Sequence, residues 1–257
     1  MTHSDDGLEQ AARLIEQALV RGERLEGLPE QCRPTDHAQA YEIQRRLADR
    51  LGQCGGWKVG AKAPDPEAPR HYSPLPASLV REGPVELAFS RFSYPALEAE
   101  EAFKLGKDLP ARERPYSPAE VREAVASVHA VIELVDSRFM AWPEGVDALT
   151  QLADLQNNGF LVVGEGVSDW QSLALDSLAV TLSVDDAEIV NTRGGNPAGD
   201  PFALLVWLAN ALPDQSQALH AGEIVTCGSC TGKYPAKGPL DGVATFESLG
   251  RAELRLV

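Results

Sequence analysis

The amino-acid sequence predicts an α+β fold in which a mixed β-sheet is folded into a roll. Apolar residues recur at helical spacing in the N-terminal part, whereas the last third shows short strand-like runs separated by turn residues. Alternating β-α units are few, which disfavours a doubly wound parallel sheet. A chain of 257 residues with 44% hydrophobic content can bury one substantial core. We therefore expect a helical segment over residues 1–55 packed on a β-roll domain over residues 56–257, as one structural unit.

Capping and turn residues place the expected helices. Asp36 with Gln39 three residues later is typical of a helix start, and residues 117–120 (SPAE) form a capping box with proline at the first helical position. Gly55-Gly56 is expected to end the second helix and Pro213 the last. The expected helices cover residues 8–20, 36–54, 118–128, 146–155 and 201–212.

The expected strands follow from short apolar or alternating runs. They cover residues 57–62, 97–105, 131–136, 160–163, 223–227, 242–247 and 252–257, with a hairpin over 178–190 around Asp185-Asp186. The segment from Pro64 to Pro76 contains five prolines. It is expected to be a loop, long enough to serve as a lid.

The charge of the chain limits its partners. The formal net charge is −15, so nucleic acid and anionic membrane surfaces would be repelled. No apolar run approaches the roughly 20 residues of a membrane span, and the N-terminus lacks the pattern of a signal peptide. We expect a cytoplasmic protein that binds neither nucleic acid nor membrane, and an anionic substrate would need a local cation.

Two glutamates share one face of a predicted strand. Side chains alternate faces along a strand, so Glu98 and Glu100 point to the same side of the run at residues 97–105. Carboxylates this close repel each other unless one is protonated, both are in water, or a cation lies between them.

A third carboxylate comes from the next predicted strand. Glu133 stands in the apolar run at residues 131–136, where an unpaired charge is rare. Three carboxylates from two strands form the oxygen-only kind of site that suits Mg²⁺ or Mn²⁺, with positions left for water and substrate. The alternative is an acidic strand face in water, which is common in acidic proteins.

Three further polar residues have two interpretations each. Lys58 lies between apolar residues and close to glycines, so it either holds the carboxylate or enolate oxygen of a ligand or extends from a strand edge into solvent. Asp154 and Asn157 precede a strand and either face a site or cap the helix before it.

The four cysteines give a weaker signal. Cys227 and Cys230 form a C-x-x-C pair, but no second pair or histidine cluster accompanies them. Reduced structural cysteines are therefore favoured over a zinc site or a redox motif.

Five segments in order carry a resemblance to a known family over residues 35–257. They are residues 56–60 (GWKVG), 98–109 (EAEEAFKLGKDL), 133–138 (ELVDSR), 195–197 (GNP) with 207–210 (WLAN), and 228–232 (GSCTG). On these segments the chain resembles the 2-keto-4-pentenoate hydratase and 4-oxalocrotonate decarboxylase family, within the fumarylacetoacetate hydrolase superfamily.

The resemblance implies a site and a chemistry. It implies a fumarylacetoacetate-hydrolase-like mixed β-roll or sandwich, assembly into homo-oligomers, and association with a homologous pathway enzyme in some members. Such enzymes act on 2-oxo or 2-hydroxydienoate acids from aromatic degradation, whose 1-carboxylate and 2-oxo oxygens chelate the metal. The residues that it assigns are Glu98, Glu100 and Glu133 as ligands of Mg²⁺ or Mn²⁺, Lys58 as a catalytic and substrate-binding residue, and Asp154, Ser229 and Thr231 as substrate-binding residues.

This chain departs from the family pattern at three places. Where many hydratases carry an acidic residue in a P-D-[YF]-G segment, residues 70–75 read RHYSPL, and His71 takes the acidic residue's place. A histidine exchanges protons near neutral pH, so His71 is a candidate catalytic residue; the alternative is an unrelated surface histidine. Residues 154–159 (DLQNNG) and 199–201 (GDP) also differ from the family's usual segments. These changes concern substrate identity more than metal chemistry.

Three functions follow, in order of preference. The first is a metal-dependent hydratase that adds water to a 2-hydroxy-2,4-dienoate. The second is a 4-oxalocrotonate-type decarboxylase or a related C-C bond hydrolase, because the same metal site accepts the electrons released in those reactions. The third is a non-catalytic partner subunit of a related enzyme, and the intact set of three glutamates and Lys58 argues against it.

Overall fold

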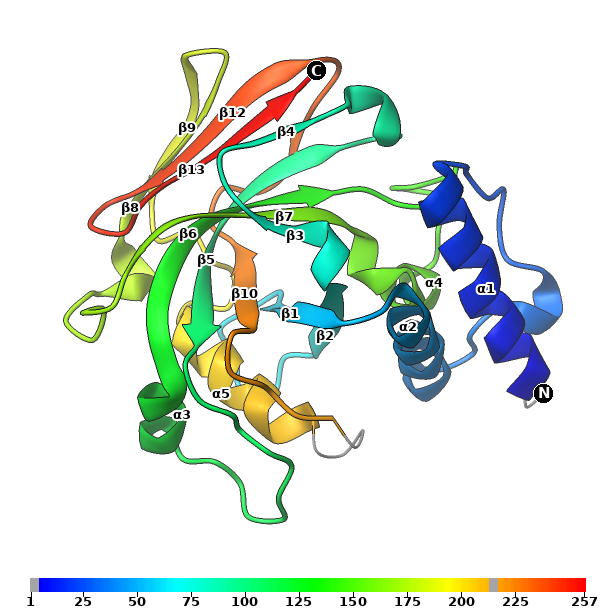
Figure 1. Ribbon diagram of the computed structural model, residues 1–257, viewed down its shortest axis with the longest axis horizontal. Helices are drawn as coiled ribbons and strands as arrows, with labels where there is room; N and C mark the ends of the chain where they lie inside the picture. Colours follow the sequence, from blue (N-terminus) through cyan, green and yellow to red (C-terminus); the bar gives the residue numbers. More distant parts are fainter. Residues whose placement is uncertain (1–4, 213–216) are drawn as a thin grey trace.

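The computed structural model describes residues 5–212 and 217–257. These residues contain two β-sheets and five α-helices (Figure 1). The helices are α1 (Asp5–Arg21), α2 (His37–Leu51), α3 (Pro118–Ala124), α4 (Ala148–Ala153) and α5 (Pro201–Ala211). None of the described helices is both long and apolar enough to cross a membrane.

The larger sheet is mixed and carries the long central strands β5 and β6. Its order is β2-β1-β10-β5-β6-β7-β3, with β11 paired to β5; β1 with β10 and β3 with β7 are parallel pairs, and the other pairs are antiparallel. The strands are β1 (Cys54–Ala61), β2 (Arg70–Pro76), β3 (Val80–Glu82), β5 (Ala96–Leu105), β6 (Val125–Val135), β7 (Asn158–Val167), β10 (Ile224–Ser229) and β11 (Tyr234–Pro235).

The smaller sheet packs across β6 and β7 through its strand β13, at the top of Figure 1. Its order is β4-β13-β12-β8-β9. The strands are β4 (Val85–Leu87), β8 (Ala179–Val184), β9 (Ala187–Arg193), β12 (Leu240–Phe246) and β13 (Gly250–Leu256). The larger of the two hydrophobic clusters among the described residues contains side chains from both sheets and from the helices. The predicted α+β fold with a mixed sheet is confirmed.

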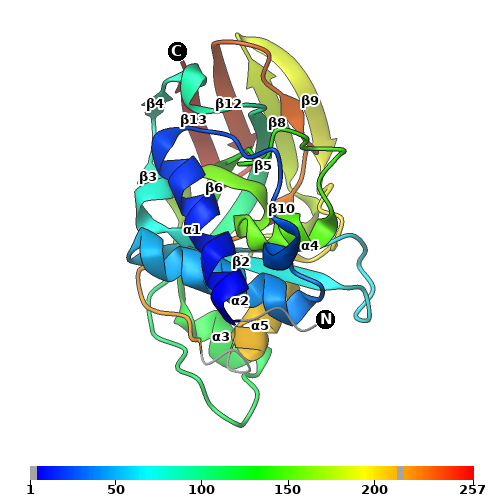
Figure 2. The same ribbon diagram turned by 90° about the vertical axis from the view of Figure 1, so that its right-hand side faces the viewer.

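The helices α1 and α2 lie side by side on one flank of the sheets (Figure 2). The Asp36 side chain accepts a hydrogen bond of 2.8 Å from Gln39 N and caps α2, as expected from the sequence. The buried face of α2 then packs against β2 and α4. This contact brings the N-terminal end of α2 to the edge where β1 and β2 pair.

The predicted end of the second helix was wrong. The helix ends at Leu51, with Gly52 as its C-cap at φ 100°, and Gly55 and Gly56 belong to β1. A Cβ on Gly56 would lie 2.1 Å from the Ile224 carbonyl oxygen. Glycine is therefore needed there for the close approach of β10, not to stop a helix.

The expected proline-rich loop is also wrong in its second half. Residues 70–76 form β2, which pairs with β1 along its whole length. Because β2 lies at the edge of the sheet, a proline can occupy it without removing a hydrogen bond from a second neighbour. Only the connection at residues 62–69 is available as a loop.

Two helices are shorter than expected. The third ends at Ala124, and Val125 and Val128 belong to β6, because pairing with β5 outweighs the helical spacing of these apolar residues. The fourth covers only Ala148–Ala153. Pro213, the expected end of the last helix, lies outside the described residues.

Candidate active site

The pairing of β5 with β6 brings together the three glutamates singled out in the sequence. Glu98 lies directly opposite Glu133 in the antiparallel ladder, and Glu100 is two residues further along the same face of β5. One carboxylate oxygen from each of the three lies within 4.8 Å of the other two. The cluster therefore follows from strand periodicity and register alone.

The three carboxylates are buried, which excludes an acidic face in water. Glu98, Glu100 and Glu133 are 8%, 3% and 1% exposed. Burial, followed by repulsion from Glu133, raises the pKa of Glu98. The same two causes, with a further contribution from Glu98, raise the pKa of Glu100 to about 8. The cluster holds more negative charge than its surroundings neutralise.

The β10 strand supplies hydrogen bonds to Glu100. Thr226 Oγ1 and Gly228 N both donate to Glu100 Oε2, the latter at 3.0 Å. Gly228 lies at a register shift of β10 against β5 with φ +89°, a conformation that glycine adopts without strain. The backbone N–H of Gly228 reaches the carboxylate because of this irregularity.

Lys58 is the ammonium group of the cluster. Its Nζ lies 2.5 Å from Glu133 Oε1 and 3.2 Å from the Gln156 carbonyl oxygen. Burial lowers its pKa, but the nearby glutamates outweigh this effect, so the pKa of Lys58 is raised and the side chain is charged. Asn158 Nδ2 donates to the same Glu133 oxygen at 3.0 Å. When all three carboxylates are ionised, one ammonium leaves two negative charges over, which a divalent cation would balance.

A left-handed turn positions the Gln156 carbonyl. Leu155, Gln156 and Asn157 have φ values of 50°, 52° and 59°, which cost energy for residues other than glycine. The buried Arg138 guanidinium donates to the backbone carbonyls on both sides of this turn, Asp154 O and Asn158 O, at 2.5 Å each.

The structure does not bring Asp154 into the cavity. Its carboxylate is fully buried and accepts hydrogen bonds from Arg138 Nε at 2.5 Å and Ser137 Oγ at 2.9 Å. It therefore anchors Arg138 and, through it, the turn at residues 155–157. Asp200, in the segment that departs from the family's pattern, caps α5 by accepting a hydrogen bond from Phe202 N and does not line the cavity either.

The carboxylate cluster forms the floor of a cavity of about 380 Å³. Ser229 lines it, whereas Thr231 does not; Thr231 Oγ1 accepts a hydrogen bond from Ala99 N at 3.1 Å. His71 lines the outer wall and stacks on His37, with ring centroids 5.2 Å apart. Burial, and then the charges of His37 and Lys62, lower the pKa of His71.

Several residues of the site were not singled out in the sequence. Lys62 has a sequence signal, because it has the same strand parity as Lys58. Thr226 and Asn158 could have been found only by their position, because Thr226 lies in an expected strand and Asn158 in the segment 154–159. The Gln156 group that contacts Lys58 is a backbone carbonyl, so its side chain gives no signal. The additional residues that line the cavity or bind its carboxylates are His37, Lys62, Gln151, Gln156, Asn158, Thr226, Gly228 and Lys233.

The chain is similar to several known proteins. A family model described as the C-terminal region of fumarylacetoacetate (FAA) hydrolase matches residues 39–254. The chain is 27% identical to 2-keto-4-pentenoate hydratase from Paraburkholderia phymatum over 256 residues, covering 96% of each chain. A 4-oxalocrotonate decarboxylase from a Pseudomonas species is 24% identical over 223 residues, covering 82% of this chain and 84% of the relative.

A solved structure has the same fold over the full length. It is 4-oxalocrotonate decarboxylase from Pseudomonas putida G7, complexed with magnesium and adipate, with a TM-score of 0.86 and 20% sequence identity. The match covers 100% of this chain and 99% of that one.

Proposed function

Because the chain belongs to the fumarylacetoacetate hydrolase family, we propose that it is a divalent-metal-dependent hydratase that adds water to a 2-hydroxy-2,4-dienoate. The substrate is of the 2-keto-4-pentenoate type, from the degradation of aromatic compounds. Relatives with that activity match nearly the whole chain and support this assignment.

The observation that carries the proposal is the buried, undercompensated carboxylate cluster at the floor of the cavity. Glu98, Glu100 and Glu133 offer oxygen ligands of the kind that Mg²⁺ and Mn²⁺ prefer. When bound, such an ion supplies positive charge that stabilises negative charge on the 2-oxygen of the substrate. The cluster fits a divalent ion because, when its three carboxylates are ionised, the Lys58 ammonium balances only one of their charges.

The chain's own residues bind the substrate and move its protons. The Lys58 ammonium donates hydrogen bonds to the acid head of the substrate, and Lys233 on the cavity wall adds a second positive charge. His71 lies on the same sheet face as Lys58, because it pairs with Gly60 in the neighbouring strand. The Cα atom of His71 is roughly 7 Å from that of Lys58, along the diagonal between the two strands. His71 therefore lies further from the carboxylate cluster than Lys58 does. That position suits a histidine that gives a proton to the far end of the diene, after which water adds to C4 of the enone.

Relatives named 4-oxalocrotonate decarboxylase support a second candidate on the same site, the loss of carbon dioxide from a vinylogous keto acid; a C-C bond hydrolase is the related alternative. A non-catalytic partner subunit is disfavoured, because such a subunit has no need for three buried carboxylates around one lysine.

Three further properties belong to the proposal. We expect a cytoplasmic protein and, as the family resemblance implies, a homo-oligomer. The helical segment 1–55 and the catalytic domain 56–257 work as one unit, because α2 contributes His37 to the cavity wall.

The decisive assay offers the purified protein 2-hydroxypenta-2,4-dienoate with Mg²⁺ or Mn²⁺. We expect the dienol absorbance to fall and 4-hydroxy-2-oxopentanoate to form, as followed by NMR, and both changes to stop when a chelator removes the metal. Carbon dioxide release from 2-oxohex-3-enedioate without water addition to the dienoate would favour the decarboxylase instead. Absence of metal binding together with absence of both reactions would contradict the proposal.

A further inference from the structure

The peptide group between Cys227 and Gly228 stands outside the regular pairing of β10. Thr226 is the last residue of β10 that pairs with β1, where its partner is Lys58. On the other side, the pairing of β10 with β5 resumes at Ser229, after a register shift. Because the pairing skips this peptide group, its N–H and C=O need partners from outside the two ladders.

The N–H of this peptide group binds one glutamate of the carboxylate cluster. Gly228 N donates to Glu100 Oε2 at 3.0 Å, and Thr226 Oγ1 donates to the same oxygen. Among the described residues both donors to Glu100 bind Oε2, so Oε1 is the oxygen available to an ion. The direction of the Gly228 N–H therefore affects how the Glu100 carboxylate is turned.

The C=O of the same peptide group binds the side chain of Asn196. Asn196 Nδ2 donates to Cys227 O at 2.6 Å and to Gly228 O at 3.3 Å. Asn196 Oδ1 accepts a hydrogen bond from Ala198 N at 3.0 Å. These partners fix the orientation of the amide, because its nitrogen must face the two carbonyls and its oxygen the backbone N–H. Asn196 itself does not line the cavity.

Asn196 and Glu100 thus bind opposite sides of one rigid unit. The peptide group is planar and trans, so its C=O and N–H point in opposite directions. Holding the Cys227 oxygen therefore also holds the Gly228 N–H. Gly228 has φ +89° and, as a glycine, does little by itself to resist rotation of this group. A hydrogen bond to the carbonyl also polarises the N–H and strengthens the bond that it donates.

The connection that carries Asn196 lies directly against the end of β10. Gly195 has φ +94°, and a Cβ there would lie 2.3 Å from the Cys230 carbonyl oxygen. A Cβ on Gly228 would lie 3.4 Å from Asn196 Oδ1. The glycine at position 195 therefore permits the close approach that brings the asparagine to the peptide group.

We propose that Asn196 is a positioning residue of the metal site. It holds the Cys227–Gly228 peptide group, and the Gly228 N–H in turn keeps the Glu100 carboxylate in the orientation that leaves Oε1 available to the ion. Asn196 acts through this peptide group and contacts neither ion nor substrate. This inference rests on the proposed function, because it takes Glu100 as a ligand of a divalent cation.

The test is a calorimetric titration of the metal-free Asn196→Asp variant with Mn²⁺. Aspartate keeps an oxygen for Ala198 N but loses the donor to the two carbonyls, so Mn²⁺ affinity should fall by about 10- to 100-fold. The added negative charge by itself attracts a cation and works against this fall. Asn196→Ala, which adds no charge, should also lower the affinity. Asn191→Asp, the same change at an exposed asparagine of β9, is the matched control and should bind Mn²⁺ as the wild type does.

A double-mutant cycle separates positioning of Glu100 from a general loosening of the protein. In a Glu100→Gln background, Asn196→Asp should lower Mn²⁺ affinity further by less than about threefold, because the ligand that it positions is already altered. In a Glu98→Gln background it should keep its full effect. Electron paramagnetic resonance of free Mn²⁺ measures the weak affinities of the double variants.

The outcomes separate this inference from the proposed function. Unchanged Mn²⁺ affinity in Asn196→Asp, or an equal fall in the Glu98→Gln and Glu100→Gln backgrounds, would overturn the positioning role and leave the metal site intact. Failure of the wild type to bind Mn²⁺ would overturn the proposed function and this inference with it.

Discussion

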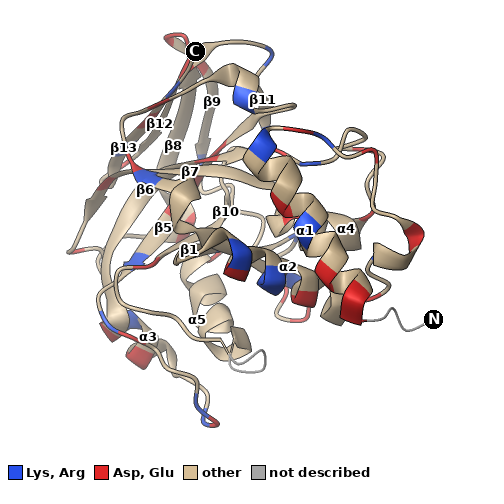
Figure 3. Ribbon diagram, turned by 45° about the vertical axis from the view of Figure 1, so that its right-hand side comes forward, with Lys and Arg blue, Asp and Glu red and all other residues tan. Residues whose placement is uncertain are grey.

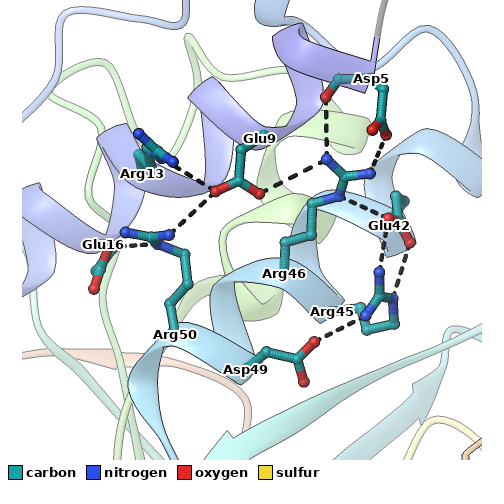
Figure 4. A network of polar contacts seen from close by, with 9 residues as sticks. All are labelled: Asp5, Glu9, Arg13, Glu16, Glu42, Arg45, Arg46, Asp49 and Arg50. Carbon is teal, nitrogen blue, oxygen red and sulfur yellow. Dashed lines mark hydrogen bonds and ion pairs between the residues drawn. The ribbon is translucent and has the colours of Figure 1, made fainter.

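The ion pairs between α1 and α2 and the carboxylates of the cavity show two ways in which this protein handles acidic side chains. On the outer side of the two helices, acidic side chains and arginines alternate in a network that solvent reaches (Figures 3 and 4). Its members are Asp5, Glu9, Arg13, Glu16, Glu42, Arg45, Arg46, Asp49 and Arg50. Each of these acidic residues contacts at least one arginine, so the network needs no further ligand.

The cavity has the opposite arrangement. Glu98, Glu100 and Glu133 are buried, and the Lys58 ammonium pairs with Glu133. Burial, and then repulsion between the glutamates, raise the pKa values of Glu98 and Glu100. Acidic residues alone therefore do not indicate a functional site in this protein. Acidic residues that are buried without enough counter-charge do indicate one.

The largest effect should appear when removal of the buried lysine of the cavity is compared with removal of an exposed, ion-paired lysine elsewhere. Lys58→Met takes away the ammonium that pairs with Glu133 and that, in the proposed function, binds the substrate, so kcat/KM should fall by about 10²- to 10⁴-fold. Lys104→Met breaks an exposed lysine–glutamate pair of 3.4 Å with Glu82 and should leave kcat/KM unchanged. Steady-state hydration rates at saturating Mg²⁺ measure both. Similar losses in the two variants would show that burial of the pair is irrelevant.

Breaking a buried ion pair should cost more stability than breaking one in the network. Asp154→Asn leaves Arg138 buried without a counter-charge, so the free energy of unfolding should fall by about 3–5 kcal/mol. Glu16→Gln, which removes a partly exposed partner of Arg50, should change it by no more than about 1 kcal/mol. Chemical denaturation followed by circular dichroism gives both values. Equal losses of unfolding free energy would show that burial of an ion pair makes no difference to its contribution.

A conservative change in the carboxylate cluster should act on metal affinity rather than on folding. Glu100→Gln keeps the shape of the side chain but removes one ligand charge, so Mn²⁺ affinity should fall by at least ~100-fold. The same change at Glu9 in the exposed network serves as the control and should leave Mn²⁺ affinity as it is. Unaltered affinity in Glu100→Gln would mean that the ion binds elsewhere.

The smallest effect is a pH dependence of the metal-free protein. The pKa of Glu100 is raised from 4.5 to about 8, so the folded state binds this proton more tightly than the unfolded state does. The stabilisation is complete below pH 4.5 and is lost as the pH rises through about 8. The Tm of metal-free protein should therefore fall by a few degrees between pH 6 and pH 8.5, a range chosen to bracket that pKa.

Added Mg²⁺ separates the contribution of the carboxylate cluster from the contribution of Glu101. Glu101, on the opposite face of β5, has a pKa raised to about 8 by burial and by the charges of Asp200 and Asp176. It contributes with the same sign but does not belong to the carboxylate cluster. The part of the Tm loss that Mg²⁺ reverses is assigned to Glu98 and Glu100 together, since the pKa values of both are raised, and a Tm that stays constant or rises with pH in metal-free protein would contradict the assignment.

Much of the carboxylate cluster was predictable because it depends on strand periodicity. The alternation of side chains placed Glu98 and Glu100 on one face, and the apolar run around Glu133 marked a buried strand with a charge in it. Antiparallel pairing of consecutive long strands then places Glu133 opposite Glu98. The alternation of side chains and the pairing of consecutive strands were enough to predict the carboxylate cluster.

The remaining features depend on interactions that local pattern does not encode. The apolar residues from Val121 to Val128 fit a helix, but the pairing partner β5 decides that the second half is a strand. The prolines of residues 70–76 are tolerated because β2 is an edge strand, which depends on the strand order of the whole sheet. The left-handed turn that directs the Gln156 carbonyl to Lys58 depends on the buried Arg138–Asp154 pair. The family resemblance implied substrate binding by Asp154, whereas its carboxylate pairs with the buried Arg138.

The measurement that tests the central claim most directly is a calorimetric titration of the metal-free wild-type protein with Mn²⁺, alone and with oxalate. The account predicts one ion bound per chain, with tighter binding when oxalate, a mimic of the 2-oxo acid head, occupies the positions that the three glutamates leave free. Absence of Mn²⁺ binding in the presence of oxalate, at a pH where the carboxylates are ionised, would contradict it.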